Sequence, residues 1–206
     1  VPNMMDGRTL VNVLNKHEKW VLGTRLIEDP SGKKMGKTEG NIVNISDFAE
    51  VKYEGIMTWP DSAIPMGFEL ITSVPMEQVY IVSEMLQKGE LDPMQAKEAL
   101  AYRVVAELDG HKEAQFAKEE FGRVKREGML PQRMGEILIT PDMKISQILV
   151  ASGLVKNPEE AATRIAQKSI FIDGKQSEKD TKWPTSAETI ALGKRTIKNI
   201  RRVVFQ

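Results

Sequence analysis

Cysteine is absent from the 206 residues of this chain, and only two histidines are present. Without cysteine there is no disulfide framework, no thiolate zinc site and no cysteine nucleophile, which disfavours a small secreted module. His17 and His111 have no companions at ligand spacing, so we expect no metal site of the usual zinc type. These absences favour a reducing compartment, and we expect the protein in the cytoplasm.

Long hydrophobic runs are also missing. The longest apolar stretches, such as residues 145–154, are broken by polar side chains and fall short of the about 18 residues that a membrane span needs. Residues 1–6 lack the basic start and apolar centre of a signal peptide. With 41% hydrophobic and 28% charged residues the chain resembles an average soluble protein, so we expect a buried core and no membrane partner.

The net charge of zero conceals an uneven distribution of charge. Residues 141–206 hold 12 Lys and Arg against 7 Asp and Glu, whereas the other 140 residues hold 17 against 22. The C-terminal third is therefore basic and the rest acidic. A basic unit of this kind is the electrostatic footprint of a protein that binds a phosphate backbone.

The pattern of apolar residues divides the chain into three parts. Residues 1–47 are mixed, and the apolar run over 20–27 predicts a buried strand and its continuation. Residues 48–135 are helical, because Asp92 and the following proline form a helix start, Gly110 ends that helix, and a second helix runs on to Gly128. We expect these two helices to form an antiparallel pair.

The third part, residues 136–206, predicts a small α+β unit. Two short helices, one ending at Gly153 and one beginning after Asn157, precede a strand over 169–172 that runs into an Asp-Gly turn. Residues 189–205 are typical of a final hairpin. The length alone predicts one or two domains, whereas these patterns predict three: 1–47, 48–135 and 136–206.

A lysine-rich loop over residues 28–41 carries the sharpest functional signal. A phosphate-loop NTPase is disfavoured, because only three residues separate its glycines and Thr38 precedes a poor helix opening. Ser31 and Lys34 have the spacing of a penicillin-binding motif, but its partner motifs are absent. Lys34 and Lys37 could instead neutralise charge on a departing pyrophosphate, with the Thr38 hydroxyl as an added donor. The alternative is a solvated basic loop.

The surroundings of this loop favour the first interpretation. The segment Lys34-Met35-Gly36-Lys37-Thr38 resembles the Lys-Met-Ser-Lys-Ser signature loop of class I aminoacyl-tRNA synthetases, in the glycine-and-threonine form of some tyrosyl-tRNA synthetases. Further segments resemble bacterial tyrosyl-tRNA synthetases in the same order along nearly the whole chain: 7–10, 20–30, 40–41, 57–61 and 92–105.

The last seventy residues are similar to the RNA-binding domain named after the fourth ribosomal small-subunit protein, and this implies its αL motif. The similarity rests on residues 148–154, 160–165 and 172–175, while Asn157 replaces the usual serine and Lys168-Ser169 replace common glycines. For any single lysine a solvated role is the simpler one, but the cluster as a whole favours RNA. The predicted RNA-binding residues are Lys156, Arg164, Lys168, Lys175, Lys194 and Arg195.

The resemblance implies an activity for the parent enzyme. It would make tyrosyl-adenylate from tyrosine and ATP, with Mg²⁺, and then transfer tyrosine to tRNA(Tyr). Residues 34–38 would bind ATP, with Lys34, Lys37 and Thr38 catalytic. The family also needs a His-x-Gly-His signature, which histidines at 17 and 111 cannot provide. We therefore expect a C-terminal portion of such an enzyme that is inactive alone and holds no cofactor alone.

The resemblance also implies the fold class, a multidomain α plus α+β arrangement. It comprises the tail of a nucleotide-binding catalytic domain, a helical anticodon-recognition domain and the small α+β RNA-binding domain, in a parent enzyme that is a homodimer. An alternative is a stand-alone, non-catalytic RNA-binding protein that retains a relic of the loop. An independent ATP-binding enzyme is favoured least, because no acid-base constellation accompanies the loop.

Overall fold

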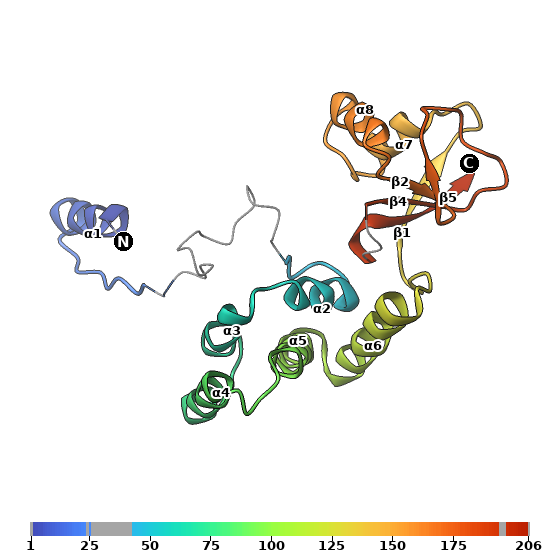
Figure 1. The fold of residues 1–206 in the computed structure, drawn as a ribbon. Coiled ribbons are helices and arrows are strands. Elements are labelled where there is room, and N and C mark those ends of the chain that lie inside the picture. The colour runs from blue at the N-terminus through green and yellow to red at the C-terminus, as the bar shows by residue number, and fades with distance from the viewer. Residues whose placement is uncertain (1, 24, 26–42, 194–196, 206) are drawn as a thin grey trace.

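The computed structural model describes residues 2–23, 25, 43–193 and 197–205 (Figure 1). Its elements form a mixed α/β structure, with a group of helices followed by one five-stranded sheet that carries two helices. None of the helices in the described ranges is long and apolar enough to cross a membrane.

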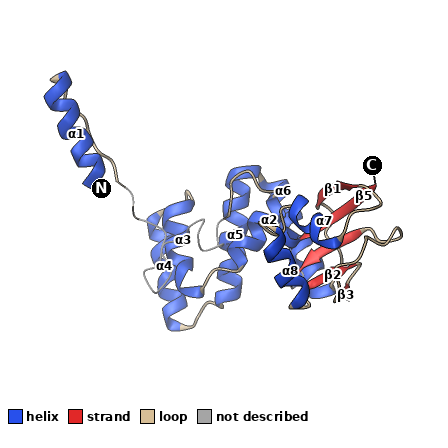
Figure 2. Ribbon diagram, turned by 90° about the horizontal axis from the view of Figure 1, so that it is seen from above, coloured by secondary structure: helices blue, strands red, loops and turns tan. Residues whose placement is uncertain are grey.

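The first helix, α1 (Pro2–Asn15), buries none of its residues, and it lies away from the other elements in Figures 1 and 2. The strand predicted next is wrong for the described residues 20–23 and 25, which form no regular element; Trp20 is 95% exposed and Leu22 is 86% exposed. A strand needs a neighbour for its N–H and C=O groups, and the sheet that the structure describes is built from residues 135–205. Residues 24, 26 and 27 lie outside the described ranges.

The helical part has five α-helices joined by short turns. These are α2 (Ala49–Met57), α3 (Ile64–Ile71), α4 (Met76–Lys88), α5 (Pro93–Asp109) and α6 (His111–Gly122), with a 3-10 turn at Asp61–Ala63 and a π-helical turn at Arg123–Glu127. Helix α2 packs against α5 and α6, and α3 packs against α4 and α5. Their shared core contains the fully buried Tyr53, Ile64, Leu100 and Val105.

The helix ends follow the sequence signals. The Asp92 carboxylate accepts a hydrogen bond from the Met94 backbone N–H at 3.3 Å, and α5 stops at Gly110, whose φ is 93°. Gly128, with φ 67°, ends the π-turn that continues α6. Glycine supplies these left-handed conformations without steric cost. Both predicted helices and their ends are therefore confirmed.

The C-terminal part is a sheet in the order β1-β5-β4-β2-β3. Strands β1 (Gly135–Ile139) and β5 (Ile200–Phe205) are parallel, while β4 (Thr189–Leu192) pairs antiparallel with β5 and with β2 (Ile170–Ile172), which pairs antiparallel with β3 (Lys175–Ser177). Helices α7 (Ile145–Ala151) and α8 (Pro158–Ala166) cover one face, and a 3-10 turn at Ile197–Asn199 precedes β5. The predicted helices, turn and final hairpin are confirmed.

Two hydrophobic cores lie along the chain. One is formed by buried residues between Ala49 and Ala117, and the other by buried residues between Ile137 and Val203. Separate cores are the usual mark of separate folding units. The boundaries at 47/48 and 135/136 remain predictions.

Glu50, in the first turn of α2, is a buried carboxylate. Its side chain is fully buried, and neither carboxylate oxygen has a hydrogen-bond partner in the described part of the chain. Burial raises the pKa of Glu50, and this outweighs the opposing effects of its own backbone N–H and the Arg133 charge. The folded state then holds this proton more tightly than the unfolded state, so stability falls as the pH rises from the unfolded pKa through the folded pKa.

We predict that Glu50→Gln raises the melting temperature at pH 7 by about 2–4 °C, which is the shift expected for roughly 1 kcal/mol in a chain of this size. The gain should disappear as the pH falls below the ordinary pKa of glutamate, where Glu50 is protonated in both states. Differential scanning fluorimetry across this pH range measures it. Glu160→Gln is the control. The folded state lowers the pKa of Glu160, so removing this carboxylate should lower the melting temperature at pH 7. A lower melting temperature of Glu50→Gln at pH 7 would contradict the assignment.

Candidate nucleic-acid interface

Helix α8 positions two of the predicted RNA-binding cations. The helix begins where the Asn157 side-chain oxygen accepts a hydrogen bond from the Glu160 backbone N–H at 2.8 Å, and Pro158 occupies its first position. Ala161 and Ile165 point into the core. Side chains at other helix positions, including the half-buried Arg164, are left at the surface.

Glu160 brings Lys156 and Arg164 together. Its Oε2 accepts a hydrogen bond from the Lys156 backbone N–H at 2.9 Å, and its Oε1 lies 3.3 Å from Arg164 Nη2. The pKa of Glu160 is below its ordinary value, chiefly because of the hydrogen bond from the Lys156 backbone and then because of the one from Arg164. Glu160 is therefore ionised at neutral pH, and it partly neutralises Arg164.

The β2–β3 hairpin places Lys168 and Lys175. Lys168 has φ 54°, in the left-handed region, and its carbonyl oxygen accepts a hydrogen bond from Gln176 Nε2. This conformation explains physically why glycine suits the position. Lys168 Nζ lies 2.7 Å from Glu178 Oε1, while the exposed Lys175 opens β3 opposite Ile172.

The four described cations thus come from two places in this unit: Lys156 and Arg164 both contact Glu160, the first through its backbone N–H, while Lys168 precedes β2 and Lys175 begins β3. Arg164 and Lys168 have carboxylate partners, whereas the side chains of Lys156 and Lys175 form no ion pair with any described residue. Exposed ion pairs contribute only about 0–1 kcal/mol, so a phosphate could replace either carboxylate. The remaining predicted site residues lie outside the described ranges: Lys34, Met35, Gly36, Lys37, Thr38, Lys194 and Arg195.

The second face of the sheet, away from α7 and α8, carries an apolar row that the sequence did not indicate. The strand register places Phe171 beside Ala191 and Ala191 beside Ile200. These side chains and Leu130 line a cavity of about 480 Å³, together with acceptor groups such as Asp173. In the sequence, the one signal for this second face is that Phe171 lies between Ile170 and Ile172, so its side chain points to the opposite face of the strand.

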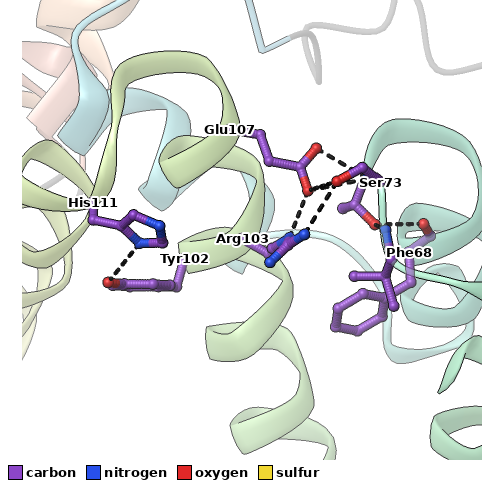
Figure 3. A network of polar contacts seen from close by, with 8 residues as sticks. Phe68, Ser73, Tyr102, Arg103, Glu107 and His111 are labelled. Carbon is purple, nitrogen blue, oxygen red and sulfur yellow. Dashed lines mark hydrogen bonds and ion pairs between the residues drawn. The ribbon is translucent and has the colours of Figure 1, made fainter.

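A groove on the helical part is lined by aromatic and polar side chains, among them Tyr102, Arg103 and His111. Figure 3 shows the polar contacts that these residues make. The Tyr102 hydroxyl oxygen and His111 Nδ1 lie 3.4 Å apart. Arg103 donates a hydrogen bond to Glu107, and Glu107 accepts further bonds from the Ser73 N–H at 3.0 Å and the Ser73 hydroxyl at 2.8 Å. Rings beside fixed polar groups are what unpaired nucleobases stack and hydrogen-bond on.

Together these surfaces offer positive charge, aromatic rings and hydrogen-bonding groups, which suits binding more than bond-breaking chemistry. No group of three His, Asp or Glu in the described residues could hold a metal ion.

Comparison with known proteins finds similarity to tRNA synthetases throughout. The family described as tRNA synthetases class I (W and Y) matches residues 2–124. The tyrosine–tRNA ligase of Thermotoga maritima is 28% identical over 196 residues, which cover 94% of this chain and 49% of the relative. Those of Carboxydothermus hydrogenoformans and Geobacter metallireducens are 29% and 28% identical, covering 83% and 99% of this chain and 43% and 51% of the relatives. The chain spans about half the length of the curated relatives it matches.

Proposed function

Because the chain belongs to the class I tRNA synthetases (W and Y), we propose that it is the tRNA-binding C-terminal part of a tyrosyl-tRNA synthetase. One observation carries the proposal: tyrosine–tRNA ligases match up to 99% of this chain with about half of their own length. In this proposal residues 1–47 end a catalytic domain, 48–135 form a helical anticodon-recognition domain, and 136–206 form a small RNA-binding domain with an αL motif.

The basic surface around α8 supports RNA as the partner. Lys156, Lys168 and Lys175 are exposed, and Arg164 is half-buried with its guanidinium at the surface beside Glu160. Cations on such a surface bind phosphates and release counterions from the nucleic acid. Lys194 and Arg195, outside the described ranges, are the other two cations of this unit that we propose bind RNA. The partner we propose is tRNA(Tyr).

The N-terminal segment supports a place in a larger catalytic domain. A 14-residue helix is marginal in water without tertiary packing, yet α1 buries none of its residues, and Trp20 and Leu22 are almost fully exposed. These apolar side chains fit a contact with further parts of an enzyme. In that enzyme Lys34 and Lys37 would stabilise charge on the departing pyrophosphate of ATP, supported by Thr38. The enzyme would activate tyrosine, work in the cytoplasm and form a homodimer, and this chain alone would be inactive.

A second candidate is a stand-alone, non-catalytic RNA-binding protein. It is favoured by the basic surface, which α8 and the β2–β3 hairpin provide without any other part of an enzyme. The described residues also contain no cluster that could hold a metal ion. Tyrosine-dependent pyrophosphate exchange separates the candidates when an upstream nucleotide-binding half is supplied. Restored exchange supports the synthetase, and exchange by the isolated chain would contradict its proposed inactivity.

For RNA binding, we predict that Arg164→Glu combined with Lys168→Glu weakens tRNA(Tyr) binding by about 10- to 100-fold at low salt, because two phosphate contacts are lost. The slope of log K against log salt should become shallower by roughly 2. Filter binding at several salt concentrations measures both. The charge-matched control is Lys16→Glu with Lys88→Glu, which lies outside the basic unit. An unchanged salt slope for Arg164→Glu with Lys168→Glu would mean that the RNA binds elsewhere.

For catalysis, we predict that Lys37→Ala in an intact enzyme containing this chain slows adenylate formation by about 10²- to 10³-fold, the usual cost of losing one donor that stabilises transition-state charge. The KM for tyrosine should stay nearly constant, because the loop acts on developing charge and not on bound tyrosine. Pyrophosphate-exchange kinetics measure both quantities. Lys33→Ala, in the same loop, should be near wild type, and equal losses in rate and tyrosine binding would oppose the assigned role.

A further inference from the structure

The junction between the helices and the sheet contains an irregular turn. Helix α6 widens into the π-turn Arg123–Glu127 just before the chain passes to β1. Single π-turns within helices are rare and often mark functional positions. This turn brings Lys125 Nζ to 2.9 Å from Glu54 Oε1, on the neighbouring helix α2.

Glu54 also binds the sheet part of the chain. The whole residue is only 3% exposed, and its Oε2 accepts a hydrogen bond from the Ile197 backbone N–H at 2.7 Å. Ile197 is buried and begins the turn that leads into β5. The Glu54 carboxylate therefore contacts both Lys125 in the π-turn and the turn that leads into β5, the strand beside β1.

A second buried carboxylate, Glu120, holds the connecting segment. It accepts a hydrogen bond from the Gln132 backbone N–H and pairs with Arg123 Nε at 3.1 Å, and Arg123 also donates to the Leu130 carbonyl at 2.9 Å. The segment between α6 and β1 is thus fixed to the helix before it. Glu54 adds a contact with the turn before β5, whose start lies beside the start of β1.

Hydrogen bonds to a buried carboxylate are directional and roughly twice as strong as neutral ones. Breaking them exposes the charge to an environment that does not solvate it, which is strongly unfavourable. An apolar contact could slide, whereas this arrangement is satisfied in one relative orientation. The orientation that satisfies Glu54 also fixes the direction in which α8 and the β2–β3 hairpin face relative to the helices (Figures 1 and 2).

We propose that Glu54 is a positioning residue for tRNA binding: it holds the basic surface around α8 and the helical part in one preset orientation, so that both contact a single tRNA. The inference rests on the proposed function. A protein whose competent orientation is only partly populated binds more weakly in proportion to that population. Losing Glu54 should therefore cost affinity without removing any RNA-contacting side chain.

The absence of cysteine permits a direct test in the full chain, because two introduced cysteines are labelled specifically. Spin labels at Lys88→Cys, at the end of α4, and Lys179→Cys, after β3, report the distance between the two parts by electron-electron resonance. We expect one narrow distance distribution for the parent chain and a broad one for Glu54→Ala. Glu98→Ala is the control, because its ion pair with Lys118 joins α5 to α6 within the helical part, and it should stay narrow.

Affinity for tRNA(Tyr) supplies the functional readout. Glu54→Ala should bind about tenfold more weakly, as expected when roughly a tenth of the molecules hold the competent orientation, and saturating tRNA should narrow its distance distribution again. Glu54→Gln, which keeps an acceptor for the Ile197 N–H, should recover most of the affinity. Lys125→Met disturbs the same joint from its more exposed side and replaces Glu54→Ala if that variant fails to fold.

Three results would overturn the inference: a broad distribution in the parent chain, a narrow one in Glu54→Ala and Lys125→Met, or weaker binding without any broadening. If the parent chain binds no tRNA, the proposed function fails. The distances measured without tRNA still decide whether Glu54 fixes the orientation.

Discussion

The structure depends on the need to satisfy charges that α2 buries. Glu50, Lys52 and Glu54 recur at every second position of this helix, and each is at most 3% exposed. Lys52 Nζ donates to Asp109 at 2.8 Å and to the Ile45 carbonyl at 2.9 Å, which ties the end of α5 and the chain before α2 to this helix. Glu50 has no such partner, but a buried group that stays charged needs one. Through Lys52 and Glu54, α2 therefore connects the end of α5, the π-turn and the start of β5.

This constraint relates the fold to its proposed role. The helical part offers a groove with Tyr102 and His111, and the sheet part offers a basic surface around α8 whose cations are balanced locally by Glu160 and Glu178. Such balance permits the cations to lie close together before RNA arrives, since the carboxylates reduce their mutual repulsion. Phosphates can then replace exposed carboxylates at little cost, whereas the buried contacts of Glu54 remain in place.

Local signals in the sequence were sufficient for most of the elements. Asp92 and Asn157 cap helices through their own side chains, and Gly110 and Gly128 end helices because they accept positive φ. Over the described residues 20–23 and 25 the expected strand is wrong, because pairing is not local: apolar residues form a strand only where a neighbouring strand exists. The π-turn had no sequence signal, and the charged residues of α2 would be read as a solvated face.

The candidate site shows the same limit. The spacing of Glu160 and Arg164 along a helix made their contact predictable, but the pairing of Lys168 with Glu178 depends on the hairpin, and that of Glu54 with Ile197 joins residues 143 positions apart. The 480 Å³ cavity on the second sheet face needed the strand register. Lys34, Lys37, Thr38, Lys194 and Arg195 lie outside the described residues, so their roles stay predictions from sequence resemblance.

Under the proposed function, this chain is a tRNA-binding part of a tyrosyl-tRNA synthetase and should recognise its own tRNA. A competition experiment measures this: labelled tRNA(Tyr), bound to the full chain, is displaced by unlabelled tRNA(Tyr) or by an unlabelled tRNA for another amino acid. We expect tRNA(Tyr) to displace the label at concentrations at least about tenfold lower, the factor that 1.4 kcal/mol of specific contacts provides. Equal displacement by both tRNAs, or no binding at low salt, would contradict it.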